Sequence, residues 1–426
     1  MHALTSLIQN DMKPALGVTE PGAIAFAVAK AKACLKGELI SAHVAMNSGM
    51  YKNAFTCGIP NSREVGTVFS AALGAVAGNA EKGLEALADV GEDDNEKARQ
   101  LVERGKITVS MSGISSRIFI EATVKGENEW ASVTIRDSHT NITKIVCNGE
   151  TLLETEDESK AEAAAEETPL IHRYTLRELL DYIETVPAEE IGFIREAYRV
   201  NMALFEEGLR SDRTTFAKRL LEKNGGKVFS DDEERTASLL CNAAIEARVI
   251  GLDKPAMSIT GSGAHGIIAT LPLYAAHRVT GYSEERLLRA TALSYLICMY
   301  IKEYSGRLSA FCGCAIAAGS GMACALAWLR GGKEAELTHV LYNMASSITG
   351  MICDGGNQGC TMKGVAAVAA AYESVDFAMH GVYIRSVHGI NGKTAEETMR
   401  NMGRIASPGM VATEGTIVEI CEEKLK

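Results

Sequence analysis

Residues 107–136, ITVSMSGISSRIFIEATVKGENEWASVTIR, alternate apolar and polar side chains in three short runs. The runs are Ile107–Ser112, Arg117–Val124 and Trp130–Arg136. A two-residue period places successive side chains on opposite faces of a strand. The stretch therefore predicts three strands of an antiparallel meander with one buried face. Leu39–Met46 alternates in the same way and predicts a further strand.

The chain that precedes these strands is predicted to be partly helical. Pro21–Gly37 is rich in alanine, and Val65–Gly78 is rich in small residues. Residues 1–150 are thus predicted to form a mixed α+β domain with a small antiparallel sheet. Residues 151–170 hold many Glu and Ala residues and few large apolar ones, which predicts an acidic linker.

From Leu176 onward, apolar residues recur with helical spacing. The predicted helices are Leu176–Thr185, Ala188–Glu207, Asp231–Val249, Ser283–Tyr304, Ala335–Thr349, Gly364–His380 and Thr394–Ile405. Residues 171–426 are therefore predicted to form an all-helical domain. The predicted fold class of the whole chain is α+β, with the sheet confined to the N-terminal part.

The composition narrows the class of protein. Of 426 residues, 46% are hydrophobic, 6% are aromatic and 40 are Gly, which predicts close-packed helices built on small side chains. The formal net charge of −11 offers no basic footprint for a nucleic-acid partner. The N-terminus lacks the basic and apolar regions of a signal peptide, and 11 cysteines, an odd number, argue against a disulfide framework. We expect a cytoplasmic protein with reduced thiols.

One uncharged segment raises the alternative of a membrane span. Residues 308–329 carry no charge and are numerous enough to cross a bilayer. The segment is rich in Gly, Ala, Ser and Cys, so we expect a buried helix that its neighbours approach closely, and no membrane partner.

Two pairs of cysteines lie among small, turn-forming residues, where the backbone can approach a bulky inorganic group. They are Cys312 and Cys314, separated by one Gly, and Cys353 and Cys360, separated by Asp-Gly-Gly-Asn-Gln-Gly. Cysteine thiolates hold iron–sulfur clusters, and two pairs brought together by the fold could cradle one. The alternatives are buried thiols and a structural zinc site, whose Cys-x₂₋₄-Cys spacing these pairs fit poorly.

Several short motifs together point to a family. In chain order they are Gly17-Val18-Thr19-Glu20-Pro21, Tyr51-Lys52-Asn53, Gly58-Ile59-Pro60, Ser138-His139-Thr140-Asn141-Ile142, Thr260–Gly266, Leu308–Ala315 and Gly350–Gly355. In their order and spacing, the chain resembles the L-cysteine desulfidases and the related α-type domain of iron–sulfur L-serine dehydratases.

The resemblance implies α,β-elimination from a small amino-acid substrate, first of all the conversion of L-cysteine to sulfide, ammonia and pyruvate. It also implies a [4Fe-4S] cluster held by three cysteines, with one iron left open. An open iron can act as a Lewis acid, by the logic of an open catalytic metal site. Cys353 and Cys360 are the first candidate ligands, followed by Cys314 and then Cys312.

Histidines in two of the motifs are candidate catalytic bases. His265 lies in a Gly-rich loop whose exposed amides can bind a carboxylate, with Ser262 and Gly263 as predicted substrate contacts. His139 is the second candidate, and Thr140 and Asn141 are predicted to contact the substrate. The alternative for both histidines is ordinary turn chemistry.

The motif around residue 52 supplies further candidates. Lys52 is predicted to anchor the substrate carboxylate, with Asn53 as a substrate contact; the alternative for Lys52 is a solvated lysine. Glu20, just before Pro21, is expected to stabilise the start of the following helix rather than to take part in catalysis.

Two positions depart from the family pattern. Val18 stands where many relatives have Cys, and Ala264-His265 replaces an expected Asn-Gln. These departures motivate a close alternative, an L-serine dehydratase-like deaminase of another β-substituted amino acid. A further alternative is a cluster-free relative that binds a small molecule without turnover. Small-residue helical surfaces also make a homodimer an expectation.

Overall fold

The computed structural model describes residues 1–155, 168–306 and 308–424. Within them, one six-stranded sheet has the strand order β3-β2-β4-β5-β6-β7. Its strands are β2 (Ser41–Asn47), β3 (Ile107–Gly113), β4 (Phe119–Lys125), β5 (Trp130–Arg136), β6 (Ile142–Cys147) and β7 (Glu150–Glu154). The alternation in the sequence predicts neither β6 nor β7, because β6 is half-buried along its whole length and β7 is exposed along its whole length.

The pairing of the strands follows the predicted meander with one departure. β4, β5, β6 and β7 pair antiparallel in succession. β3 is not the antiparallel neighbour of β4: it pairs in parallel with β2, which lies between them. A long helical connection joins β2 to β3, and such a crossover returns the chain in the same direction, as a parallel pair requires. The turn from β5 to β6 carries His139.

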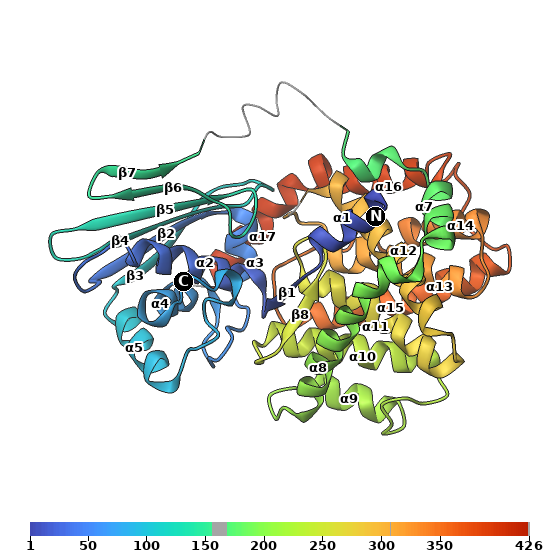
Figure 1. Ribbon diagram of the computed structural model, residues 1–426, viewed down its shortest axis with the longest axis horizontal. Helices are drawn as coiled ribbons and strands as arrows, with labels where there is room; N and C mark the ends of the chain where they lie inside the picture. Colours follow the sequence, from blue (N-terminus) through green and yellow to red (C-terminus); the bar gives the residue numbers. More distant parts are fainter. Residues whose placement is uncertain (156–167, 307, 425–426) are drawn as a thin grey trace.

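Helices of small residues cover one face of this sheet. α2 (Thr19–Lys32) packs on β4 and β5, and α4 (Gly66–Ala77) packs on α2 and β3. The remaining helices of this region are α3 (Ser48–Ala54), α5 (Glu92–Glu103) and the short 3₁₀ turn η1 (Gly83–Glu85). Strand residues that point toward α2, such as Val44, Ala122 and Val133, are fully buried. We call strands β2–β7 with these helices the sheet region (Figure 1).

The C-terminal part is helical, as predicted, and we call it the helical region (Figure 1). Its α-helices are α7 (Leu176–Thr185), α8 (Arg195–Arg210), α9 (Phe216–Lys223), α10 (Glu233–Val249), α11 (Gly263–Thr280), α12 (Glu284–Ser305), α13 (Gly319–Leu329), α14 (Glu334–Ile348), α15 (Gly359–Met379) and α16 (Ala395–Arg404). Its 3₁₀ and π segments are η2 (Leu170–Arg173), η3 (Ala188–Ile194), η4 (Cys314–Ala318) and η5 (Ile405–Gly409). The predicted α+β fold class is confirmed.

The uncharged segment 308–329 lies inside the helical region. The π-helical turn η4 leads into α13, and every residue of α13 is buried. At Gly321 the neighbouring α12 approaches so closely that a Cβ atom would lie 2.2 Å from the carbonyl oxygen of Ser294. The prediction of a buried, closely approached helix is confirmed for α13. In the described part of the chain, no helix combines the length and apolarity needed to cross a bilayer.

The two ends of the chain cross between the regions. α1 (Ala3–Asp11) packs on α12, and β1 (Lys13–Leu16) pairs antiparallel with β8 (Pro255–Ser258) of the helical region. At the other end, α17 (Val411–Glu423) packs on α3 of the sheet region. Of the predicted acidic linker at 151–170, residues 156–167 fall outside the described residues, and the predicted domain boundaries stay a prediction.

A buried ion pair fastens α17 to α3. The Nζ atom of Lys52 lies 2.7 Å from Oε2 of Glu414, and the two side chains are 0% and 6% exposed. Lys52 also donates to the carbonyl oxygen of Ser309, 3.1 Å away. Lys52–Glu414 is therefore an ion pair of the protein interior rather than of its surface.

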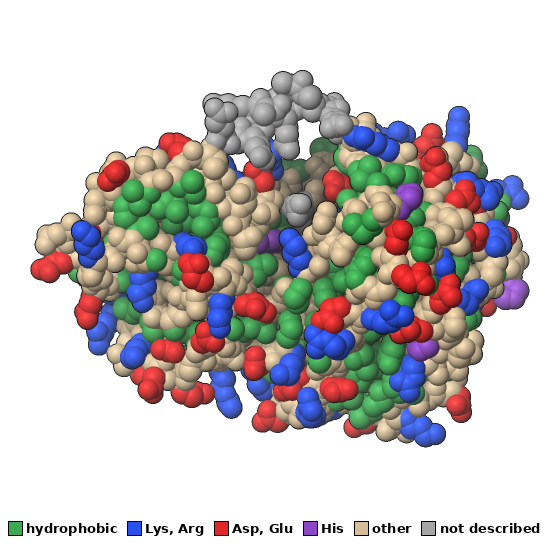
Figure 2. Space-filling view, viewed as in Figure 1, with side chains coloured by type: hydrophobic (Ala, Val, Ile, Leu, Met, Phe, Trp, Pro, Cys, Tyr) green, Lys and Arg blue, Asp and Glu red, His purple; other side chains and the backbone are tan. Residues whose placement is uncertain are grey.

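On the molecular surface, acidic and basic side chains are interspersed, and the face shown in Figure 2 carries no broad field of one sign.

Removing one partner of the Lys52–Glu414 pair should cost much more than removing both. Lys52→Met leaves the Glu414 carboxylate buried without its cation, and we expect a loss of about 3–5 kcal/mol in the free energy of unfolding. The double variant Lys52→Met/Glu414→Leu should lie closer to the wild type, because no buried charge remains. Urea unfolding measures both. As a control, Lys82→Met breaks the exposed Lys82–Asp89 pair and should lower the free energy of unfolding by less than about 1 kcal/mol. If Lys52→Met lowers the free energy of unfolding by no more than Lys82→Met does, the expectation is contradicted.

Candidate active site

A small cavity of about 80 Å³ lies between the sheet region and the helical region. Residues from both regions line it: Glu20, Asn53 and His139 from the first, and Thr260, Gly261, Ser262, His265, Lys302, Leu308, Ser309, Phe311, Gly313, Cys314 and Cys353 from the second. Six residues that the sequence nominates thus meet at one place, although they come from segments as far apart as α3 and the loop before α15. These six are Asn53, His139, Ser262, His265, Cys314 and Cys353.

On the sheet-region side, a buried carboxylate organises the wall of the cavity. Glu20 belongs to the first turn of α2 and is 5% exposed. Its Oε1 atom accepts from the amide nitrogen of Asn53 at 2.9 Å, and its Oε2 atom accepts from the hydroxyl of Thr19 at 3.1 Å. His139 places Nε2 3.7 Å from Oε1 of Glu20. Burial alone would raise the pKa of Glu20, but His139, Asn53 and Arg248 together lower it to about 2.

On the opposite side, His265 is held as a neutral imidazole. It lies in the first turn of α11 and is 5% exposed. Burial lowers its pKa well below the ordinary value, and the nearby cations Lys302 and Arg248 lower it further. Its Nδ1 atom lies 2.5 Å from the hydroxyl of Thr260, which already donates to the carbonyl oxygen of Ile259. We therefore assign the proton to Nδ1, which leaves the lone pair on Nε2.

The backbone of the Thr260–Gly266 motif explains how His265 reaches this position. Thr260 has φ +52° and Gly261 has φ +75°, so the chain turns sharply between β8 and α11. Gly266 allows α11 to lie against β8, because a Cβ atom there would be 1.8 Å from the carbonyl oxygen of Met257. The predicted Gly-rich loop is thus in part a helix N-terminus, where backbone amides point outward.

Two buried cations lie next to this wall. Lys302 of α12 lines the cavity, is 7% exposed and donates to the carbonyl oxygen of Gly306 at 2.7 Å. Arg248 of α10 is 5% exposed, and its Nε atom has no hydrogen-bond partner within the described residues. Arg248 influences both Glu20 and His265. The cavity therefore has an acidic side at Glu20 and a basic side at Lys302.

The two cysteine segments are joined by backbone hydrogen bonds. The amide of Cys312 donates to the carbonyl oxygen of Met351 at 3.0 Å, and the amide of Cys353 donates to that of Ala310 at 2.6 Å. Cys314 begins the π-helical turn η4, and Cys360 is the second residue of α15. Short π segments inside helices are frequent at functional sites. The fold thus brings together the two pairs that the sequence singles out.

The thiols are close enough to influence one another. The pKa of Cys360 is raised to about 11, mainly by burial. The thiol of Cys353 and, to a smaller extent, that of Cys312 contribute to this rise. A hydrogen bond with Cys314, together with burial, raises the pKa of Cys312 well above its ordinary value. Lys363 lies beside them: burial opposes its charge, but Asp354 and the thiols of Cys360, Cys353 and Cys312 raise its pKa. The Lys363 cation is therefore near enough to these thiols to interact with them electrostatically.

This donor set suits an iron–sulfur cluster in its chemistry. Such clusters take separate thiolates on separate irons, and four thiols on two bridged segments can supply them. Among the described residues, no three His, Cys, Asp or Glu side chains converge as a single metal ion would require. The structural zinc site raised from the sequence stays an alternative.

Val18, where the family pattern has Cys, lies beside the cysteine segment. A Cβ atom at Gly356 would be 2.9 Å from Cγ1 of Val18, and one at Gly355 would be 2.4 Å from the carbonyl oxygen of Lys52. Gly355 also has φ +110°. The turn between Cys353 and Cys360 is therefore pressed against α3 and the start of α2, and Val18 presents an apolar side chain at this point.

Other residues nominated from the sequence do not line the cavity. Lys52 is held by Glu414 and Ser309, although its charge also partly offsets the rise in the pKa of Cys353 caused by burial. Thr140 and Asn141 are exposed, and Asn141 closes the β5–β6 turn by donating to the carbonyl oxygen of Arg136 at 3.1 Å. Gly263, Cys312 and Cys360 are not among the residues that line the cavity. Their proposed roles stay predictions.

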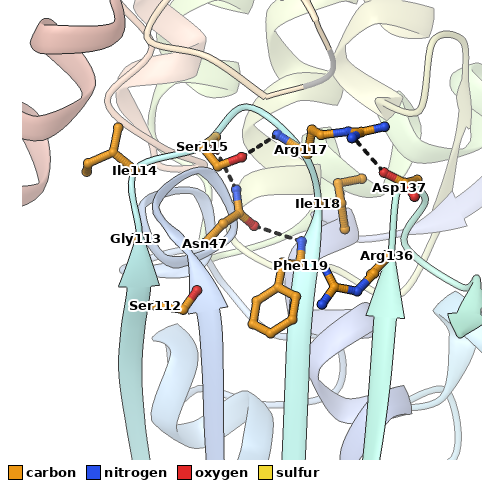
Figure 3. A pocket seen from close by; sticks show the side chains of 10 residues that line it. All are labelled: Asn47, Ser112, Gly113, Ile114, Ser115, Arg117, Ile118, Phe119, Arg136 and Asp137. Carbon is orange, nitrogen blue, oxygen red and sulfur yellow. Dashed lines mark hydrogen bonds and ion pairs between the residues drawn. The ribbon is translucent and has the colours of Figure 1, made fainter. Parts of the chain in front are cut away.

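A larger pocket of about 390 Å³ lies at the end of the sheet (Figure 3). Asn47 spans it, donating to the carbonyl oxygen of Ser115 at 2.7 Å and accepting from the amide of Phe119 at 3.0 Å. Arg117 pairs with Asp137 at 3.3 Å. Neither the cysteines nor the histidines nominated from the sequence line this pocket, and the motifs identified in the sequence do not include its polar residues.

Three residues of the site escape sequence reasoning. Glu20 was expected only to stabilise a helix start, and Lys302 and Arg248 were not singled out. Lys302 and Arg248 lie on α12 and α10 among apolar residues. A charged residue on a helix that is otherwise buried all round is the signal that could have found them, because unpaired charge is rarely buried without a function or a partner.

Comparison with known proteins places the chain among relatives of similar length. The model of the family described as serine dehydratase alpha chain matches residues 81–419. A UPF0597 protein of Clostridium botulinum strain Langeland is 38% identical over 429 residues, which cover 100% of this chain and 99% of the relative. A UPF0597 protein of Caldanaerobacter subterraneus is 37% identical over 421 residues, with 99% and 98% coverage, and one of Clostridioides difficile is 33% identical over 426 residues, with 99% coverage of each chain.

These findings confirm the predicted relation to serine dehydratase alpha chains. The printed names of the three relatives state no activity. The more specific likeness to cysteine desulfidases therefore stays a prediction.

The lowered pKa of Glu20 makes stability depend on pH in a defined direction. A carboxylate whose pKa falls from 4.5 to about 2 on folding stabilises the protein above pH 4.5, and this contribution is lost as the pH falls toward 2. Its size is on the order of 3 kcal/mol. Urea unfolding of the wild type and Glu20→Gln should therefore show a difference that shrinks between pH 5 and pH 3. The control Glu103→Gln, at an exposed position, should show a constant difference; a constant difference for Glu20→Gln would contradict the expectation.

Proposed function

Since this chain belongs to the serine dehydratase alpha chain family, we propose that it is an iron–sulfur-dependent lyase that catalyses α,β-elimination from a small amino acid. The first candidate substrate is L-cysteine, which would give sulfide, ammonia and pyruvate. The observation that carries the proposal is the cavity itself, where two buried histidines and two cysteines from the predicted motifs meet Lys302. Its volume of about 80 Å³ favours a small substrate.

His265 is the proposed base for the α-proton. A general base needs an available lone pair close to the proton that it removes. Because Nδ1 is engaged with Thr260, Nε2 carries that lone pair. Burial and, to a smaller extent, the nearby cations lower the pKa of His265, which keeps it unprotonated at neutral pH. The same cations would make the imidazole a weaker base. A substrate carboxylate bound beside Lys302 would offset this effect, because its negative charge would partly neutralise the cation.

The basic side of the cavity suits the carboxylate of the substrate. Lys302 lies there, and Ser262 caps α11 without a side-chain hydrogen bond to the helix. The first amides of a helix attract anions through their N–H groups and the helix dipole. Binding the carboxylate at Lys302 and Ser262 would place the α-carbon within the cavity that His265 also lines.

The cysteine segments would hold the cluster. Cys353 and Cys360, with Cys314 or Cys312 as the third, are the proposed ligands, and Lys363 would balance part of their negative charge. When bound, such a cluster supplies an open iron that acts as a Lewis acid on the substrate carboxylate or leaving group. Cys314 and Cys353 are the two thiols that face the cavity.

L-Serine is the second candidate substrate, and a specific finding favours it. The matching family model is described as serine dehydratase alpha chain, and loss of water from L-serine also ends in pyruvate and ammonia. The apolar side chain of Val18 beside the cysteine turn is a further difference from the pattern of the cysteine desulfidases. Both reactions require the same base and the same carboxylate contacts.

Metal analysis and an activity panel test the proposal together. Protein purified without oxygen should contain about four irons and four acid-labile sulfides per chain, and it should release pyruvate from L-cysteine or L-serine. Cys360→Ser should lose iron, whereas Cys324→Ser, a substitution deep in α13, should retain it. Absence of iron after attempted reconstitution, with no pyruvate from any amino acid tested, would overturn the proposal in favour of a cluster-free binder.

Two histidines on the same helix separate a catalytic role from a structural one. His265→Asn should lower kcat by about 100-fold or more, because general-base catalysis contributes on that scale, while iron content stays unchanged. His277→Asn lies near the other end of α11, where His277 contacts the carbonyl oxygen of Tyr282, and it should leave kcat unaltered. Steady-state pyruvate formation measures both; similar kcat values for the two variants would argue against His265 as the base.

A further inference from the structure

Two polar atoms on the acidic side of the cavity lie close together without a hydrogen bond of ordinary length between them. Oε1 of Glu20 and Nε2 of His139 lie 3.7 Å apart, and Nε2 has no hydrogen-bond partner in the described residues. His139 is 8% exposed, so water contributes little at this position. A buried polar atom without a partner is costly and calls for an explanation. Since both residues line the cavity, a ligand that donates hydrogen bonds could supply the missing partner.

The spacing of the two acceptors suits a single ammonium group. Donors and acceptors in such bonds lie about 2.8 Å apart, so one nitrogen atom can reach two acceptors that are 3.7 Å apart. An ammonium group offers three donors, which leaves a third for a further group on the cavity wall. Nε2 of His139 accepts when the ring proton is on Nδ1.

Charge points to the same kind of ligand. Glu20 is the one carboxylate among the described residues that line this cavity, and Asn53 and Thr19 keep it oriented. Lys302 lies among the residues of the opposite region. The cavity is thus polarised, with a negative group from one region and a positive group from the other.

We propose that Glu20 and His139 form the subsite that binds the α-ammonium group of an amino-acid substrate, and that Glu20 thereby selects α-amino acids over acids that lack the amino group. This inference rests on the proposed function, because it assumes that the cavity receives the substrate. It also assigns Glu20, which the sequence indicated only as a helix-start residue, a direct contact with substrate.

The subsite complements the carboxylate contacts at Lys302 and Ser262. An amino acid bound across the cavity would present its ammonium group to the sheet region and its carboxylate to the helical region. The substrate would then bridge the two regions. An acid without the ammonium group would leave the acceptors of Glu20 and His139 unpaired, and sites built to pair buried polar groups reject analogues that lack them.

A pair of non-reacting ligands tests the inference without turnover. L-Alanine and propionate differ only in the ammonium group, and neither carries a β leaving group. Calorimetric titration of the oxygen-free protein should give a dissociation constant for L-alanine at least about tenfold below that for propionate, the scale of a hydrogen bond to a charged group. In Glu20→Gln this preference should fall to near unity, chiefly through weaker binding of L-alanine.

Two further variants keep the test decisive. Glu20→Asp retains the charge and should keep part of the preference, and it also reports on the subsite if Glu20→Gln folds poorly. Glu246→Gln removes another buried carboxylate, which binds the amides of Thr215 and Ala217 outside the cavity, and it should keep the full preference. Equal affinities in the wild type, or a preference that survives in both Glu20 variants, would overturn the inference.

The outcome is separable from that of the proposed function. If no amino acid yields pyruvate but the preference for L-alanine depends on Glu20, the lyase proposal fails and the ammonium subsite stands. If pyruvate forms and the preference is unchanged in the Glu20 variants, the lyase proposal stands and the subsite is elsewhere.

Discussion

Charge buried between the sheet region and the helical region must be paired, and this constraint shapes the rest of the molecule. Lys52 is fully buried and is neutralised by Glu414, which draws the last helix back onto α3. Glu20 is buried in the same part of the fold and is held by Asn53 and Thr19. An uncompensated charge at these positions would cost several kcal/mol, so α17 must lie where Glu414 reaches Lys52, and α2 and α3 must lie where Asn53 reaches Glu20.

The arrangement of the two regions determines which charged and titratable side chains line the cavity. Each region contributes one sign of charge, Glu20 from the first and Lys302 from the second. Each also contributes a histidine, and their surroundings differ: His139 faces a carboxylate, whereas His265 lies near two cations that favour its neutral form. Titratable pairs whose environments differ in this way are typical of acid–base sites. The cysteine segments close the same space and add thiols to it.

Much of the fold was predictable because its signals are local. Alternation in residues 107–136 predicts β3, β4 and β5, and helical periodicity predicts α7 with its observed bounds. β6 and β7 escaped because neither buries one face, which removes the alternation. The parallel pairing of β2 with β3 escaped because it depends on the path of the connecting helices rather than on either strand. Among site residues, His265 and Cys353 stood out by their motifs, whereas Lys302 and Arg248 lie on helices without a distinctive pattern.

The sequence by itself determined the α+β class, the family and the residue types available for chemistry, because strand alternation, helical periodicity and motifs are properties of neighbouring residues. Tertiary structure alone decided which of them meet. Glu20 and His139 are more than a hundred residues apart in the chain, yet they lie 3.7 Å apart across the start of α2 and the β5–β6 turn. Lys52, nominated as a substrate anchor, lies 2.7 Å from Glu414 of the last helix, a contact that no local pattern indicates. Such pairings depend on long-range packing and on the free-energy cost of burying unpaired charge. Neither can be predicted from the pattern of neighbouring residues.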